Sequence, residues 1–163
     1  MQTFRVSVSK DYLVFASAHF ITFRGHHCET LHGHNYRVGV SVEGTLDEEV
    51  CFVVDFSVLK QITRRLVDAI DHKVLLPLDN PKLSITEADG AVAVAVHGSP
   101  RYVFPRGDCA LLPIANTTAE LLAEYLGRQL EADLHSRGLN RLSSLELEVE
   151  ESPGQTAVFR LSF

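Results

Sequence analysis

The chain has 163 residues, of which 45% are apolar and 22% charged, and its formal net charge is -6. This length and composition are typical of one soluble globular domain with its own hydrophobic core. The acidic balance argues against a nucleic-acid or anionic-membrane partner. The sequence also shows no apolar run of membrane-spanning length and no secretory signal at its start.

The three cysteines, Cys28, Cys51 and Cys109, cannot all pair within one chain. We therefore expect a reduced, cytoplasmic protein in which any special cysteine has a chemical role. Cys51 and Cys109 stand in apolar surroundings and are expected to be small buried side chains.

The first 44 residues are predicted to form strands. Residues 3–8 and 13–20 have strand-like patterns, with a turn predicted at 9–12, and residues 34–44 form a third strand. Side chains alternate along a strand. One face of the third strand should therefore carry Tyr36, Val38, Val40 and Val42.

Two helices follow. Asp55 is a suitable N-cap for the first, in which apolar residues recur at helical spacing. These residues are Leu59, Ile62, Leu66 and Ile70. A capping box of Thr117 and Glu120 predicts the start of the second helix, which Gly138 ends. This helix has an apolar row of Leu122, Leu126, Leu130 and Leu134.

Residues 83–112, between the helices, carry strand and turn signals and are expected to form a hairpin-like insertion in a single domain. Two more strands close the chain. The order of elements predicts an α+β fold with an antiparallel four-stranded sheet and two helices on one face. Self-association is the simplest way to cover the other face.

Five of the eight histidines lie between positions 19 and 34. His32 and His34 are two residues apart at the entry to a strand, so both imidazoles point to the same side. If the strand ending near His19 pairs with that strand, His19 supplies a third nitrogen. Three neutral imidazoles suit zinc and leave a coordination position open, which is typical of a catalytic site. His26 and His27 are expected to be solvated or to face a substrate.

Cys28 precedes His32 by four residues, and two roles remain open for it. It could be a fourth zinc ligand in a closed structural site, or a free thiol acting as a base or nucleophile. Asp71 and His72 fit either a solvated helix end or a relay for proton transfer. Of Glu150 and Glu151, one should point inward, where a carboxylate would suit the N–H edge of a pterin or guanine.

Several motifs occur together in one order: "SAHF" at His19, "CETLHGH" from Cys28 to His34, "DHK" at Asp71, "NTTAE" ending at Glu120, and "VEESP" around Glu151. In this combination the chain resembles the 6-pyruvoyl-tetrahydropterin synthase and 6-carboxytetrahydropterin synthase family over nearly its whole length.

The resemblance implies a tunnelling fold whose subunits form a β-barrel, commonly in a homohexamer built as a dimer of trimers. It implies Zn²⁺ on three residues, which are His19, His32 and His34. The substrate would be the small molecule 7,8-dihydroneopterin triphosphate, in active sites formed between subunits. Cys28 would be the base or acid, with Asp71 and His72 as its relay.

The resemblance also implies substrate-binding residues: Glu151 would anchor the pterin, with Thr118 and Glu120 assisting. The expected activity is that of a lyase forming 6-carboxytetrahydropterin for queuosine-type deazapurine synthesis. The alternatives are a 6-pyruvoyl product, side-chain cleavage to a hydroxymethylpterin, and a structural zinc or pterin-binding protein without catalysis.

This sequence departs from the family pattern at three places. Thr117 stands where a proline is usual, residues 83–112 are longer than a typical connection, and Glu29 follows Cys28 directly. Some relatives have a glutamate near this position in place of the cysteine, and they cleave the pterin side chain. Because this chain has both Cys28 and Glu29, the sequence does not decide which product it forms.

Overall fold

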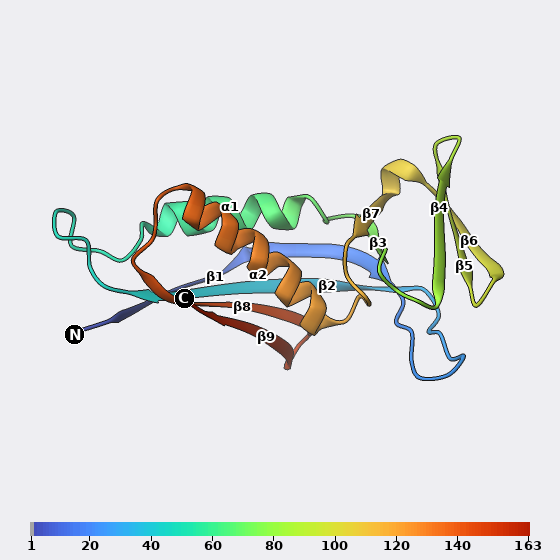
Figure 1. Cartoon of the computed structure of the whole chain (residues 1–163), viewed down its shortest axis with the longest axis horizontal. Helices are drawn as coiled ribbons and strands as arrows, with labels where there is room; N and C mark the ends of the chain where they lie inside the picture. Colours follow the sequence, from blue (N-terminus) through green and yellow to red (C-terminus); the bar gives the residue numbers. More distant parts are fainter. Residues whose placement is uncertain (1) are drawn as a thin grey trace.

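The computed structural model describes residues 2–163, with only the backbone of Lys10, and these residues form nine strands, two α-helices and one short 3-10 turn (Figure 1). In chain order the elements are β1 (Phe4–His19), β2 (His32–Gly44), α1 (Phe56–Asp68), β3 (Lys73–Pro77), β4 (Leu83–Ala88), β5 (Ala91–Val96), β6 (Ser99–Pro105), the 3-10 turn (Arg106–Asp108), β7 (Cys109–Leu112), α2 (Ala119–Ser136), β8 (Leu142–Ser152) and β9 (Gln155–Ser162).

The main sheet has six strands in the order β7-β3-β1-β2-β8-β9. The strands β1, β2, β8 and β9 pair antiparallel, whereas β1 with β3 and β3 with β7 pair parallel. The prediction of a four-stranded antiparallel sheet is therefore wrong in the number of strands and in the direction of the two added strands, β3 and β7, which pair parallel. The long connections through α1 and through β4–β6 bring β3 and β7 back parallel, as crossover connections do.

Both helices lie on the same face of the main sheet, as predicted (Figure 1). The Asp55 side chain accepts a hydrogen bond from the Ser57 N–H at 2.7 Å and caps α1. The predicted apolar rows of both helices are buried against the core-facing side chains of β2, including Tyr36 and Val38.

The start of α2 differs from the prediction by one residue. Thr118 is the N-cap, and its hydroxyl accepts from the Leu121 N–H at 3.4 Å. The capping box of Thr117 and Glu120 is therefore wrong. Thr117 is instead buried and donates its hydroxyl hydrogen bond to the Phe20 carbonyl at 3.1 Å. Two adjacent threonines satisfy the same sequence pattern, and only tertiary packing distinguishes them.

Two further expectations about local structure are wrong. β1 is one strand, and instead of turning at residues 9–12 it shifts its pairing with β2 between Ser9 and Val14. Cys51 is exposed and has a φ of 57°, whereas Cys109 is buried as expected. In the loop that contains Cys51, Val53 and Val54 are the residues that reach the core.

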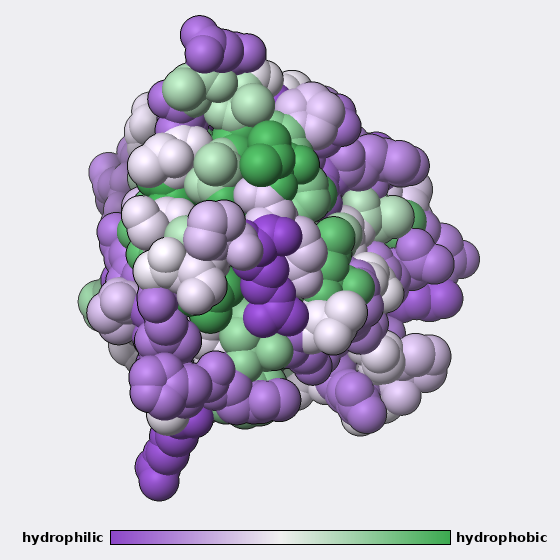
Figure 2. All heavy atoms as spheres, turned by 90° about the vertical axis from the view of Figure 1, so that its right-hand side faces the viewer, coloured by the Kyte–Doolittle hydropathy of each residue, from purple (hydrophilic) through white to green (hydrophobic). Residues whose placement is uncertain are grey.

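Residues 83–112 form more than a hairpin. β4, β5 and β6 make a separate three-stranded sheet, which we call the accessory sheet, and β7 returns to the main sheet. One face of the accessory sheet packs on an apolar cluster of Phe20, Leu76, Val92, Val94 and Cys109. Viewed from the end that carries the accessory sheet, the surface shows apolar patches separated by polar side chains (Figure 2). Among residues 2–163, no helix is long and apolar enough to cross a membrane.

The close approach of α2 to β9 gives a first prediction, for Gly127→Ala. A Cβ at Gly127 would lie 2.5 Å from Cδ1 of Phe159. Alanine gains about 1 kcal/mol of helix propensity, but overpacking costs about 1–3 kcal/mol. We expect the clash to dominate and the melting temperature to fall by a few degrees, at about 2–4 °C per kcal/mol. Adding Phe159→Leu should restore it, and a higher melting temperature for Gly127→Ala alone would contradict this packing.

Candidate metal centre and active site

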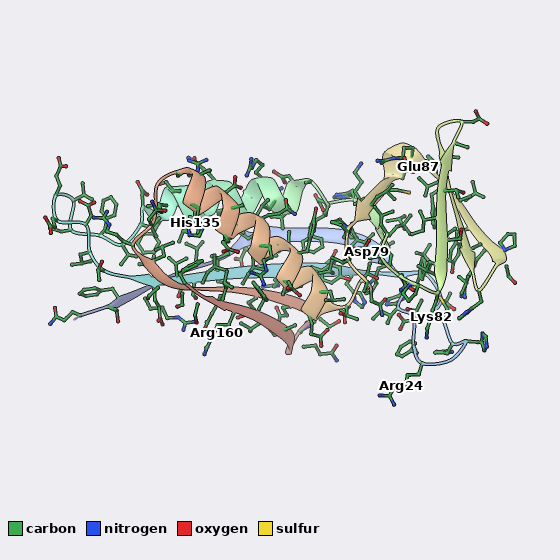
Figure 3. The ribbon with its side chains drawn as sticks, in the orientation of Figure 1. Arg24, Asp79, Lys82, Glu87, His135 and Arg160 are labelled. Atoms are coloured by element: carbon green, nitrogen blue, oxygen red, sulfur yellow. The ribbon has the colours of Figure 1, made fainter. Side chains whose placement is uncertain are left out.

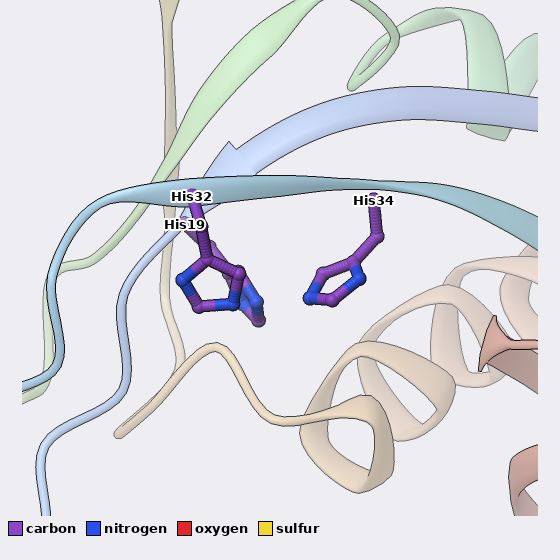
Figure 4. Close-up of side chains that lie close together, drawn as sticks. All are labelled: His19, His32 and His34. Atoms are coloured by element: carbon purple, nitrogen blue, oxygen red, sulfur yellow. The ribbon is translucent and has the colours of Figure 1, made fainter.

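Three histidines converge where β1 ends and β2 begins. In the antiparallel register His19 lies opposite His32 and Ser17 opposite His34, so the three imidazoles share the core-facing side of the sheet. One ligand nitrogen from each histidine lies within 4.8 Å of the others. The rings point toward one another (Figure 4), as the sequence predicted.

The hydrogen bonds of these rings determine which ring nitrogens are free to bind a metal. His19 Nδ1 lies 2.8 Å from the Thr117 carbonyl, and His32 Nδ1 lies 2.9 Å from the Thr30 carbonyl. A carbonyl oxygen only accepts, so each Nδ1 donates and each Nε2 keeps a lone pair. His19 is fully buried, and its Nε2 has no hydrogen-bond partner among residues 2–163.

This arrangement fits a divalent metal ion. Burial lowers the pKa of His19, which keeps its imidazole neutral and able to bind a metal. A backbone carbonyl that orients the far nitrogen of a ligand is the usual support of a metal-bound histidine. The donor set of three imidazoles suits zinc with an open coordination position.

Glu151 also reaches the histidines. It follows Val149 on the core-facing side of β8, so it points inward, as predicted for one of the two glutamates. Its Oε1 lies 3.4 Å from His19 Nε2 and 3.8 Å from His34 Nε2. Burial and the nearby Glu151 carboxylate together raise the pKa of Tyr36, which keeps this buried phenol neutral.

Cys28 and Glu29 face different surroundings. An antiparallel bridge joins Cys28 to Thr22, and the Glu29 Oε2 accepts from the Ile21 N–H at 3.2 Å. The same oxygen lies 3.8 Å from His32 Nδ1. The Cys28 side chain packs against the apolar cluster under the accessory sheet, and burial raises the pKa of its thiol. Cys28 is not part of the group that could hold an ion.

Asp71 and His72 form the expected pair, in the turn between α1 and β3. His72 Nδ1 lies 2.9 Å from Asp71 Oδ2, and Asp71 Oδ1 accepts from the Ala16 N–H at 2.8 Å. Although burial acts to raise it, these hydrogen bonds hold the pKa of Asp71 below its usual range. The His72 side chain is 82% exposed.

The Asp71–His72 pair does not meet the histidine cluster within one chain. No hydrogen bond or ion pair joins the two within residues 2–163, although His72 borders an open groove of about 510 Å³ whose lining includes His34 as well as Ala16, Ser17, Ala18, Gly33 and Asn35. Ala16, Ala18, Gly33 and Asn35 alternate with the core-facing residues of β1 and β2, so most of the groove lies on the opposite face of the sheet from the three imidazoles.

Of the remaining predicted site residues, Thr118 caps α2 and Glu120 is exposed on its first turn. The sequence reasoning missed Thr117, whose carbonyl orients His19. The sequence marks Thr117 only by its place in the "NTTAE" motif, where it suggests a helix cap and stands in place of the usual proline.

The chain matches the model of the 6-pyruvoyl tetrahydropterin synthase family over residues 7–162. A protein of Methanocaldococcus jannaschii, provisionally named a 6-carboxy-5,6,7,8-tetrahydropterin synthase, is 34% identical over 148 residues, which cover 91% of this chain and 90% of that protein.

Solved structures agree with this match. The 6-pyruvoyl tetrahydropterin synthase of Plasmodium vivax superposes with a TM-score of 0.93 at 32% identity, covering 100% of both chains. Variants of that protein in which a catalytic glutamate is replaced by alanine or cysteine superpose equally well, at 31% identity. The resemblance seen in the motifs is confirmed, and the chain belongs to the 6-pyruvoyl tetrahydropterin synthase family.

Proposed function

We propose that this protein is a zinc-dependent lyase that acts on 7,8-dihydroneopterin triphosphate, with zinc held by His19, His32 and His34. The observation that carries the proposal is the buried, unpartnered Nε2 of His19 beside two further imidazoles. Bound there, zinc would act as a Lewis acid on an oxygen of the substrate side chain.

The product that we propose first is 6-carboxy-5,6,7,8-tetrahydropterin, which the name of the M. jannaschii relative supports. For this product Cys28 would carry a proton, which requires its thiol to leave the apolar cluster. A 6-pyruvoyl product remains an alternative and agrees with the name of the P. vivax enzyme.

A second candidate is cleavage of the pterin side chain, and the position of Glu29 favours it. The Glu29 carboxylate lies 3.8 Å from His32 Nδ1, the nitrogen that also contacts the Thr30 carbonyl, whereas the Cys28 side chain packs in the apolar cluster. The P. vivax variants, described as mutants of a catalytic residue, also exchange a glutamate.

In this second reaction Glu29 takes the proton of the hydroxyl on the second side-chain carbon. The bond between the first and second side-chain carbons breaks, and its electron pair enters the pterin C6=N5 bond. A proton added at the first carbon gives 6-hydroxymethyl-7,8-dihydropterin, and the departing fragment is glycolaldehyde triphosphate. No oxidant or reductant is needed.

The other predicted site residues would act in an active site formed between subunits. We propose a homohexamer in which the Asp71–His72 pair of one subunit serves the histidine cluster of a neighbour, because the pair lies on the opposite face of its own sheet. Glu151 would bind the pterin N–H groups beside the metal, and Thr118 and Glu120 would assist it.

Product identification by mass spectrometry tests the function. The zinc-loaded protein is incubated with 7,8-dihydroneopterin triphosphate, and the pterin products are separated and weighed. We expect turnover to a carboxylated or hydroxymethylated pterin, with a mass that distinguishes the two reactions. Stoichiometric zinc with an unchanged substrate would instead show a structural zinc or pterin-binding protein.

A further inference from the structure

Both candidate proton carriers, Cys28 and Glu29, lie in the loop of residues 20–31, which joins β1 to β2. On one side the body of the protein holds this loop. The Asn116 amide accepts from the Thr22 N–H at 3.3 Å and donates to the Thr22 carbonyl at 3.0 Å. The Lys82 ammonium donates to the Phe23 and Gly25 carbonyls. Figure 3 shows Lys82 near this loop and Arg24 at its outer end.

On the other side, strand β6 of the accessory sheet holds the same loop. The Leu31 N–H donates to the Tyr102 hydroxyl oxygen at 3.2 Å. The Arg101 guanidinium donates to the Glu29 carbonyl at 3.1 Å. These two bonds fix the backbone on both sides of Thr30, directly beside Glu29 and one residue before His32.

The Cys28 side chain packs against the same apolar cluster as two side chains of this strand. Cys28, Tyr102 and Phe104 all pack against the apolar cluster under the accessory sheet. The Tyr102 ring stands 5.4 Å from the Phe20 ring, measured between centroids. Strand β6 thus binds the loop backbone and contributes side chains to the apolar cluster in which the Cys28 thiol packs.

We propose that Tyr102 and Arg101 are positioning residues that decide which of the two proton carriers faces the metal site. With both hydrogen bonds made, the Glu29 carboxylate lies beside His32, on the Nδ1 side of its ring, and Cys28 is withdrawn into the apolar cluster. The accessory sheet is on this account a determinant of product specificity. This inference rests on the proposed function, because it concerns the same site.

Removing the hydrogen bonds between β6 and the loop should change turnover in a specific way. Tyr102→Phe keeps the ring in the cluster but removes the acceptor for the Leu31 N–H, and adding Arg101→Ala removes the second bond. Displacements of about 1 Å can cost about 10²-fold in rate. We expect kcat for side-chain cleavage to fall about 10- to 100-fold in the double variant, with an unchanged KM and zinc content. The melting temperature should fall by only a few degrees, because two hydrogen bonds are lost. Arg101→Lys, which keeps a donor, should retain activity.

A second readout does not depend on activity. Cys28 is alkylated with iodoacetamide, and the modified peptides are quantified against those of Cys51 and Cys109. We expect Cys28 to react about tenfold faster in the Tyr102→Phe variants than in the wild type, since the thiol gains exposure and its thiolate fraction rises. Val103→Thr is the matched control, because Val103 lies next to Tyr102 and is 73% exposed.

The outcomes separate the inference from the function on which it rests. Slower turnover and faster Cys28 alkylation in the variants, with neither change in Val103→Thr, support the inference. Unchanged kcat and unchanged alkylation overturn it. If the wild type forms no pterin product, the proposed function fails, while the alkylation of Cys28 still reports whether β6 holds the loop. If the double variant does not fold, Tyr102→Phe alone decides.

Discussion

His32→Ala is expected to empty the metal centre and nearly abolish turnover. Removing one of three imidazoles leaves two, which hold zinc too weakly to survive purification at neutral pH. The Lewis acid contributes several kcal/mol to transition-state stabilisation, so turnover should fall about 10³-fold or more. The zinc content of the purified protein and its rate with 7,8-dihydroneopterin triphosphate measure the two effects.

His26→Ala is the matched control for this variant. His26 lies in the same histidine-rich segment, but it is exposed, its ring is tilted against that of His97 at 4.5 Å between centroids, and it is not part of the cluster. We expect it to retain zinc and activity. A His32→Ala protein that keeps one zinc per chain would refute the assignment of this ligand.

If Glu29 is the base that cleaves the pterin side chain, Glu29→Gln is expected to retain zinc and to lose about 10²- to 10⁴-fold in turnover, the usual contribution of a positioned general base. Glutamine keeps an oxygen that accepts from the Ile21 N–H, so the loop should keep its shape. What it loses is the ability to take a proton beside His32. The rates of the variant and the wild type, measured at saturating substrate, give the effect on kcat.

Cys28→Ala is the counterpart of this variant. If the side chain of the pterin is cleaved with Glu29 as base, Cys28→Ala should keep turnover within about tenfold, because the thiol packs in the apolar cluster. The opposite pattern, with Cys28→Ala inactive and Glu29→Gln active, would assign the proton transfer to the thiol and favour the carboxylated product.

The parts of the fold that the sequence predicts are those with a long regular pattern. The alternation from Tyr36 to Val42 gave the buried face of β2, and the helical rows gave both helices and their shared face. β3 was missed, and β7 was assigned to the hairpin-like segment 83–112 instead of the main sheet, because strands of five and four residues are too short to show a period. Their parallel pairing depends on how the chain crosses over, which periodicity does not encode.

The metal centre could be predicted because it needs only strand geometry. Alternation places His32 and His34 on one side, and antiparallel pairing brings His19 opposite them. The division of roles between Cys28 and Glu29 could not be predicted, because they are neighbours in an irregular loop. Their orientations depend on Tyr102 and Arg101, about 70 residues further along the chain.

The most direct test of the metal centre is X-ray absorption at the zinc edge of the purified wild-type protein. With His19, His32 and His34 as ligands, the first shell should contain only nitrogen and oxygen, at about 2.0–2.1 Å, with the outer scattering of three imidazole rings. A sulfur neighbour at about 2.3 Å would make Cys28 a ligand. That result, or a protein that binds no zinc, would contradict the account.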